Sequence, residues 1–124
     1  MKAIFIPVLL ISLATGLPFA TGCSKHTTQD LAPEKVPAAM NQAFVQASGE
    51  SKELAQDVAT ACQSQNTATA FTDLQKLSHR ADLTPEQRST TSQAMVGVLS
   101  KLRTESDQGN PSAQAVLQQY LSTR

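Results

Sequence analysis

Apolar side chains recur every three or four residues from Val36 to the end of the 124-residue chain. This spacing places them along one side of an α-helix. The same stretch contains no run in which apolar and polar residues alternate, as they do in a half-buried strand. We therefore predict an all-α fold, a small bundle of about five short antiparallel helices joined by tight turns. The expected helices are 37–47, 50–65, 68–79, 85–108 and 111–124.

Helix-start signals fix two of these boundaries. Thr84-Pro85-Glu86-Gln87 has the residues of a capping box with proline in the first helical position. Thr84 is expected to accept a hydrogen bond from the Gln87 N–H while the Gln87 side chain reaches back. Asn110-Pro111 repeats the cap and proline directly after Gly109, which is expected to end the preceding helix.

The first 22 residues have the three parts of a secretory signal. Lys2 supplies a positive charge, an apolar run follows over 3–20, and small residues close the segment. A membrane-spanning helix needs about 20 uninterrupted apolar residues, whereas this run is shorter and contains Pro7 and Pro18. We expect residues 1–22 to be a cleaved signal peptide, with an uncleaved N-terminal membrane anchor as the alternative.

The end of that run, Ala20-Thr21-Gly22-Cys23, resembles the lipobox of bacterial lipoproteins. The resemblance covers the signal segment alone, and Ala20 stands where the family more often has Leu. It implies cleavage before Cys23, a diacylglycerol on the Cys23 sulfur and, in many bacteria, a further acyl (palmitate-type) chain on the new amine. Each buried methylene of such chains adds about 0.8 kcal/mol to anchoring. In a bacterium with two membranes, Ser24 implies the outer membrane, on the side facing the periplasm.

Residues 23–35 show no helical or strand periodicity. Beyond the lipidated Cys23 they are polar with one proline, so we expect a flexible tether that spaces the domain from the lipid surface. The folded domain is expected to span 36–124. His26 lies in the tether with no metal-binding partner near it in sequence, so we expect it to be solvated.

Residues 50–82 resemble the tetratricopeptide repeat, a helix–turn–helix unit of about 34 residues. Ala70 followed by Leu74 matches the Ala-x₃-Phe element of the unit's second helix. The Trp, Gly and Tyr of the first helix are missing, and Pro85 comes late for the closing proline. The resemblance implies binding of peptides or partner proteins, and a generic bundle of helical hairpins is the alternative.

The charge balance bears on the kind of partner, and the composition of the core bears on stability. Ten basic residues balance ten acidic ones and lie singly along the chain, so no nucleic-acid partner is expected. Alanine fills much of the helical stripes, and it buries less apolar surface per residue than leucine. We expect either low intrinsic stability, relieved by a partner or by self-association, or a close-packed bundle whose alanines let the helices approach.

Few side chains suit catalysis or cofactor binding. Cys62 is an unpaired thiol on the apolar stripe of the second helix. It is either a reactive thiol or a buried side chain that packs as a small apolar residue. Ser78, His79 and Asp82 are of the types found in a hydrolytic triad, but neighbours at one helix end splay apart, and His79 suits the helix dipole. The sequence has no metal-ligand spacing, phosphate loop or paired-cysteine motif, so we expect no enzyme activity, metal or cofactor.

We therefore expect a lipid-anchored helical protein of the cell envelope that binds a protein or peptide. The aromatic side chains of the helical domain, Phe44, Phe71 and Tyr120, are the candidate lining of a partner-binding groove. The alternative is a structural lipoprotein that associates with itself and has no specific ligand.

Overall fold

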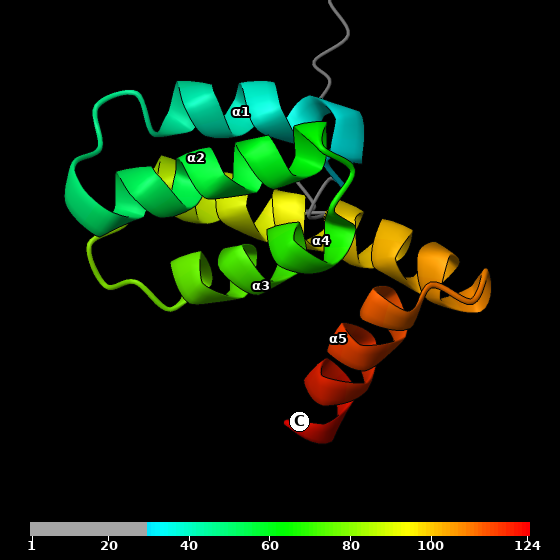
Figure 1. Ribbon diagram of the computed structural model, residues 1–124. Helices are drawn as coiled ribbons and strands as arrows, with labels where there is room; N and C mark the ends of the chain where they lie inside the picture. Colours follow the sequence, from blue (N-terminus) through cyan, green and yellow to red (C-terminus); the bar gives the residue numbers. More distant parts are fainter. Residues whose placement is uncertain (1–29) are drawn as a thin grey trace, which may run out of the picture.

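The computed structural model describes residues 30–124, which form one short 3-10 helix and five α-helices (Figure 1). Their bounds are η1 Pro33–Lys35, α1 Val36–Ala43, α2 Gly49–Gln63, α3 Thr67–Ser78, α4 Pro85–Asp107 and α5 Pro111–Ser122. This part of the chain contains no strand, which confirms the predicted all-α class.

Helices α1 to α4 pack antiparallel to their sequence neighbours and enclose one core. α2 and α3 form a hairpin, α1 lies along α2, and α4 contacts both α1 and α3 (Figure 1). The largest wholly buried side chains are Phe71, Met40, Leu74, Leu77 and Leu102. Small residues such as Ala70 and Ala94 are fully buried between the helices, which favours the close-packed interpretation of the alanine-rich stripes.

Both predicted helix starts are present. Thr84 accepts a hydrogen bond from the Gln87 N–H at 3.1 Å, and the Gln87 side chain accepts one from the Thr84 N–H at 3.0 Å. Asn110 accepts from the Ala113 N–H at 3.2 Å, and Pro111 begins α5. Gly109 follows Gln108, the C-cap of α4, and adopts a φ of 89°, a left-handed conformation that favours glycine at a helix end.

The first helix is shorter than predicted. The spacing of apolar residues predicts 37–47, but α1 ends at Ala43. The Ala43 carbonyl accepts a hydrogen bond at 3.2 Å from the side-chain nitrogen of Gln87, which lies on α4. A helix end needs partners for its last carbonyls, and here one partner comes from a residue far away in sequence.

In the turn between α2 and α3, Gln65 takes the left-handed conformation, with a φ of 55°, and Asn66 caps α3 by accepting from the Thr69 N–H. Thr67 begins α3 and is buried, and its hydroxyl donates to a Glu105 carboxylate oxygen at 2.7 Å, which joins α3 to α4.

Residues 30–35, which we call the lead segment, pack across α4. The Leu31 N–H donates to the Gln93 carbonyl at 3.3 Å, and the Leu31 side chain contacts the core. A Cβ on Gly97 would lie 1.8 Å from the Leu31 carbonyl oxygen, so only glycine lets the two backbones come this close. The predicted flexible tether therefore does not extend to residue 35. Its remaining part and the predicted signal peptide lie outside the described residues.

Candidate functional site

α5 diverges from the bundle and is its least covered α-helix. It follows the Gly109 turn, contacts α4 and α3, and then runs away from α4 (Figure 1). Its first turn is fixed by the buried Ala113 and by Gln114, whose side-chain nitrogen donates to the Ser106 carbonyl at 3.1 Å. No other residue of α5 is buried, although its apolar spacing is that of a packed helix.

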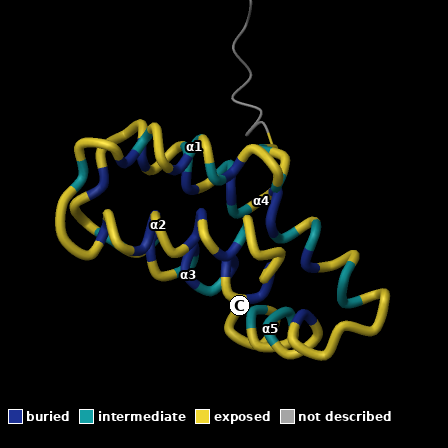
Figure 2. Tube along the Cα trace, turned by 45° about the horizontal axis from the view of Figure 1, so that its top comes forward, coloured by how far each residue is buried: buried dark blue, intermediate teal, exposed yellow. Residues whose placement is uncertain are grey.

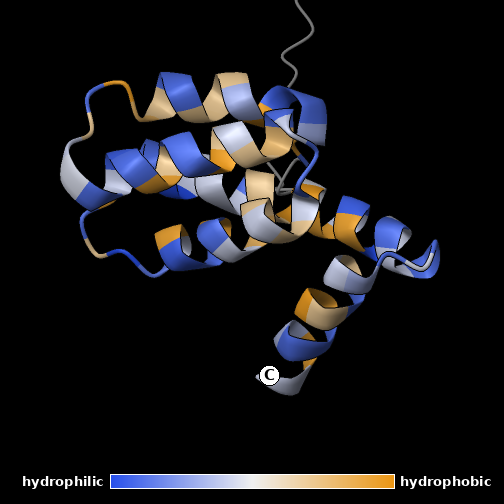
Figure 3. Ribbon diagram, in the orientation of Figure 1, coloured by the Kyte–Doolittle hydropathy of each residue, from blue (hydrophilic) through white to orange (hydrophobic). Residues whose placement is uncertain are grey.

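The apolar side chains of α5 form a stripe that the bundle covers only in part. Val116, Leu117 and Tyr120 contact the core and keep part of their surface exposed, while Leu121 is 57% exposed. We call these four residues the α5 face. Figure 2 shows α5 mainly in the exposed and intermediate colours, and Figure 3 shows a hydrophobic turn in its middle. Three of these residues are half-buried and Leu121 alone is exposed, so the α5 face is an apolar helix edge that the bundle leaves incompletely covered, and we take it as the candidate functional site.

The structure brings two of the three predicted partner-binding residues together. The rings of Phe71 and Tyr120 meet edge to face, with centroids 5.2 Å apart and planes at 89°. Phe71 is fully buried, so it supports Tyr120 from the core and does not offer its own ring to a partner. Phe44 is also buried, beside a surface hollow of about 180 Å³ that Val45 helps to line. Tyr120 is half-buried, with the Arg124 guanidinium 5.1 Å from its ring centre.

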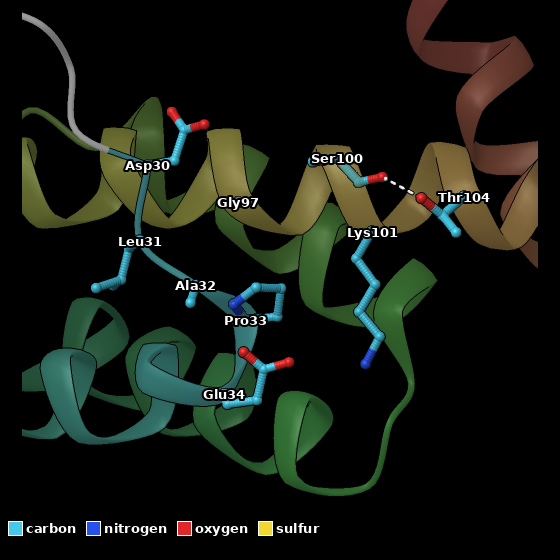
Figure 4. A pocket seen from close by; sticks show the side chains of 9 residues that line it. All are labelled: Asp30, Leu31, Ala32, Pro33, Glu34, Gly97, Ser100, Lys101 and Thr104. Atoms are coloured by element: carbon cyan, nitrogen blue, oxygen red, sulfur yellow. Dashed lines mark hydrogen bonds between the residues drawn. The ribbon is translucent and has the colours of Figure 1, made fainter.

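A groove of about 440 Å³ lies between the lead segment and α4 (Figure 4). Its lining carries both signs of charge, with Asp30 and Glu34 on the lead segment and Lys101 on α4. The Thr104 hydroxyl turns back to its own helix and donates to the Ser100 carbonyl at 3.2 Å. None of the polar side chains along this groove is buried, so the groove defines no particular ligand chemistry.

Cys62 lies half-buried on α2, on the apolar stripe where the sequence places it. Pro33 of the lead segment and Lys101 of α4 line the narrow gap beside it. Burial raises the pKa of the Cys62 thiol above its ordinary value, and the positive charge of Lys101 offsets part of that rise. Because the protonated thiol is a poor nucleophile, this environment favours a packing role over a reactive one.

Ser78, His79 and Asp82 do not assemble into a triad. The Ser78 hydroxyl donates to a carbonyl of its own helix at 2.7 Å, and His79 is the exposed C-cap residue of α3. Asp82 accepts hydrogen bonds from the buried Ser51 hydroxyl at 2.9 and 3.0 Å and from Arg80 at 3.0 Å. Asp82 therefore joins the α3–α4 turn to α2 through Ser51.

The same contact continues to Glu50, which forms an ion pair with Arg80. The hydrogen bond from Arg80, and after it the one from Ser51, holds the pKa of Asp82 below its ordinary value. Asp82 is thus ionised at neutral pH and stays an acceptor for both donors. This network positions the turn between α3 and α4.

The remaining predicted site residue, Cys23, lies outside the described residues. Within residues 30–124, no group of three or more His, Cys, Asp or Glu side chains is placed to hold a metal ion. Each helix in the described part of the chain is too short or too polar to cross a membrane. Comparisons with models of protein families, with curated proteins and with solved structures find no match to the chain.

Proposed function

We propose that this chain is a lipid-anchored protein of the bacterial cell envelope that binds a protein partner through the α5 face. One observation carries the proposal: none of the four apolar side chains of the α5 face is fully buried, and Ala113 is the single buried residue of α5. In addition, α5 itself contains no charged residue, and depletion of charge is typical of the centre of a protein interface. The tetratricopeptide resemblance of 50–82 supports the same class of function.

The lipid anchor is proposed from the lipobox resemblance at Cys23, with Ser24 favouring the outer membrane of a two-membrane bacterium. Because the lead segment is docked on α4, residues 24–29 alone connect Cys23 with the packed chain. A chain of this length spans at most about 25 Å when fully extended. The bundle would therefore act close to the lipid surface, within reach of other membrane-attached proteins.

The proposal is tested in cells with the full chain carrying a photo-crosslinking amino acid at Leu121. Val45 offers a matched control, since it is 63% exposed but lies in the α1–α2 connection, away from α5 (Figure 1). We expect a protein crosslink from position 121 and none from position 45. A Cys23→Ser variant should lose both palmitate labelling and membrane attachment. Equal crosslinking from both positions would contradict binding through α5, and membrane retention of Cys23→Ser would contradict the lipid anchor.

A further inference from the structure

The lead segment fills the space between two helices. Its 3-10 helix η1 contacts both α2 and α4, whose backbones do not approach each other anywhere in residues 30–124. Pro33, the first residue of η1, lines a gap of about 10 Å³ together with Cys62 of α2 and with Val98 and Lys101 of α4. A cavity of this size is at the lower limit for one water molecule, so Pro33 closes this side of Cys62 to anything larger.

Few interactions hold the lead segment in this position. Among residues 30–124, one backbone hydrogen bond joins it to α4, from the Leu31 N–H to the Gln93 carbonyl at 3.3 Å, and the ion pairs all lie elsewhere. Leu31 is half-buried, and η1 has no buried residue. Segments with so few buried contacts open locally while the rest of a domain stays folded.

The chain is firmly held immediately after the lead segment. Val36 and Met40 of α1 are wholly buried in the core. The lead segment can therefore leave α4 by a rotation of the backbone near Lys35, while α1 and the core stay packed. Its departure would join the gap beside Cys62 to the groove in Figure 4, because Pro33 and Lys101 line both.

From this arrangement we infer that the lead segment is a strap that controls chemical access to the Cys62 thiol. While it is docked on Gly97, the strap shields the thiol, and once released from α4 it leaves the thiol open to reagents from the groove. Cys62 is the one free cysteine of the described residues, so a single side chain reports the position of the strap. The inference uses residues 30–124 alone and depends neither on the α5 face nor on a lipid at Cys23.

Alkylation of the full chain by iodoacetamide tests the strap, in a Cys23→Ser background where Cys62 is the only thiol. Gly97→Ala drives the strap away, because the new Cβ would lie 1.8 Å from the Leu31 carbonyl oxygen, and Leu31→Ala weakens the same contact from the other side. Each should raise the alkylation rate about fivefold to tenfold, since the population of the open form governs the rate. The combined variant should react no faster than Gly97→Ala, in which the strap is already released.

The pH dependence separates access from acidity. Release of the strap should raise the alkylation rate even at a pH where the thiol is fully ionised. Lys101→Met is the matched control, because it removes a charge beside the thiol but keeps a long side chain in the gap. It should move the inflection of the pH profile and leave the rate above that inflection unchanged.

A second control separates release of the strap from general loosening of the bundle. Asn110→Ala removes the cap of α5, away from the strap, and should leave alkylation unchanged. Circular dichroism checks that every variant is folded at the temperature of the assay. If Gly97→Ala does not fold, Leu31→Ala decides the question, because its side chain is only half-buried.

Two results would overturn the inference. One is unchanged alkylation in the folded strap variants, and the other is an equal increase after Asn110→Ala. Neither result bears on partner binding through the α5 face, which the crosslinks from Leu121 test separately.

Discussion

A single residue, Gly97, decides where the chain before α1 packs. Glycine inside a helix costs about 1 kcal/mol relative to alanine, so its presence in the middle of α4 calls for a compensating contact. That contact is the Leu31 backbone, which approaches the bare Cα face of Gly97 and is fixed by a hydrogen bond to Gln93. The isolated glycine is visible in the sequence, but nothing near it tells which segment fills the space.

Gly97→Ala should therefore destabilise the domain by about 1–3 kcal/mol, the usual cost of overpacking. Alanine is the better helix former, but its Cβ would lie 1.8 Å from the Leu31 oxygen, so the lead segment must move. Denaturant unfolding of the full chain measures the change. Ser92→Ala, at an exposed position of the same helix, should stay within about 0.5 kcal/mol. A stabilised Gly97→Ala variant would show that the lead segment does not dock.

The Cys62 thiol gives a second prediction at this scale. Since burial raises its pKa above the ordinary 9.0, the folded protein keeps this proton to higher pH than the unfolded chain does. Alkylation by iodoacetamide should therefore be slow at neutral pH and rise with an inflection above 9.0, measured in a Cys23→Ser background. Urea should return the inflection to the ordinary value. Lys101→Met should move it higher still, and an inflection below 9.0 in the folded chain would refute the assignment.

Among the elements, helix starts were predictable and helix ends less so. The capping box at Thr84 and the cap at Asn110 rely on side chains within three residues of each helix start, so the local sequence contains the whole interaction. The end of α1 depends instead on Gln87 reaching the Ala43 carbonyl from another helix. Where the partner of a backbone group is distant in sequence, spacing and propensity cannot locate the boundary.

The cap of α5 should stabilise that helix alone. Asn110→Ala removes the acceptor of the Ala113 N–H and should cost about 1 kcal/mol. Because α5 beyond Ala113 has no buried residue, hydrogen exchange should show its amides losing protection while those of α3 keep theirs. Asn66→Ala, which removes the cap of the core helix α3, should instead lower the stability of the whole bundle. Equal loss in α3 and α5 after Asn110→Ala would contradict a separately opening α5.

Over the whole molecule, the sequence predicts the class of fold better than the candidate site. Helical spacing marks Phe44, Phe71 and Tyr120 as members of apolar stripes, but burial depends on how the helices are arranged in space. Two of these rings are enclosed by the core, and Tyr120 keeps exposed surface because α5 diverges from the bundle. Leu121 belongs to the same predicted stripe, and only the packing shows that no neighbouring helix covers it.

Phe71 and Leu121 should therefore respond oppositely in stability and binding. Phe71→Ala empties a fully buried site and should cost about 3–5 kcal/mol, enough to unfold a small domain. Leu121→Ala, at a position that is 57% exposed, should cost no more than about 0.5 kcal/mol and still weaken partner crosslinking from a photo-crosslinking amino acid moved to the exposed Gln118 of the same helix. Thermal unfolding beside the crosslinking yield separates the two effects. Comparable stability losses would mean that Leu121 belongs to the core.

The docking of the lead segment also determines how the bundle bears mechanical load. A pull on the lead segment acts on α4 through Leu31, and Figure 4 shows the lead segment crossing α4 rather than running along it. Tension is thus delivered sideways to the middle of a 23-residue helix instead of to the end of one. The first element to yield should be the single Leu31–Gln93 hydrogen bond. Its rupture would release the lead segment from α4 before the helices α1 to α4 are stretched, so this contact would give way before the core does.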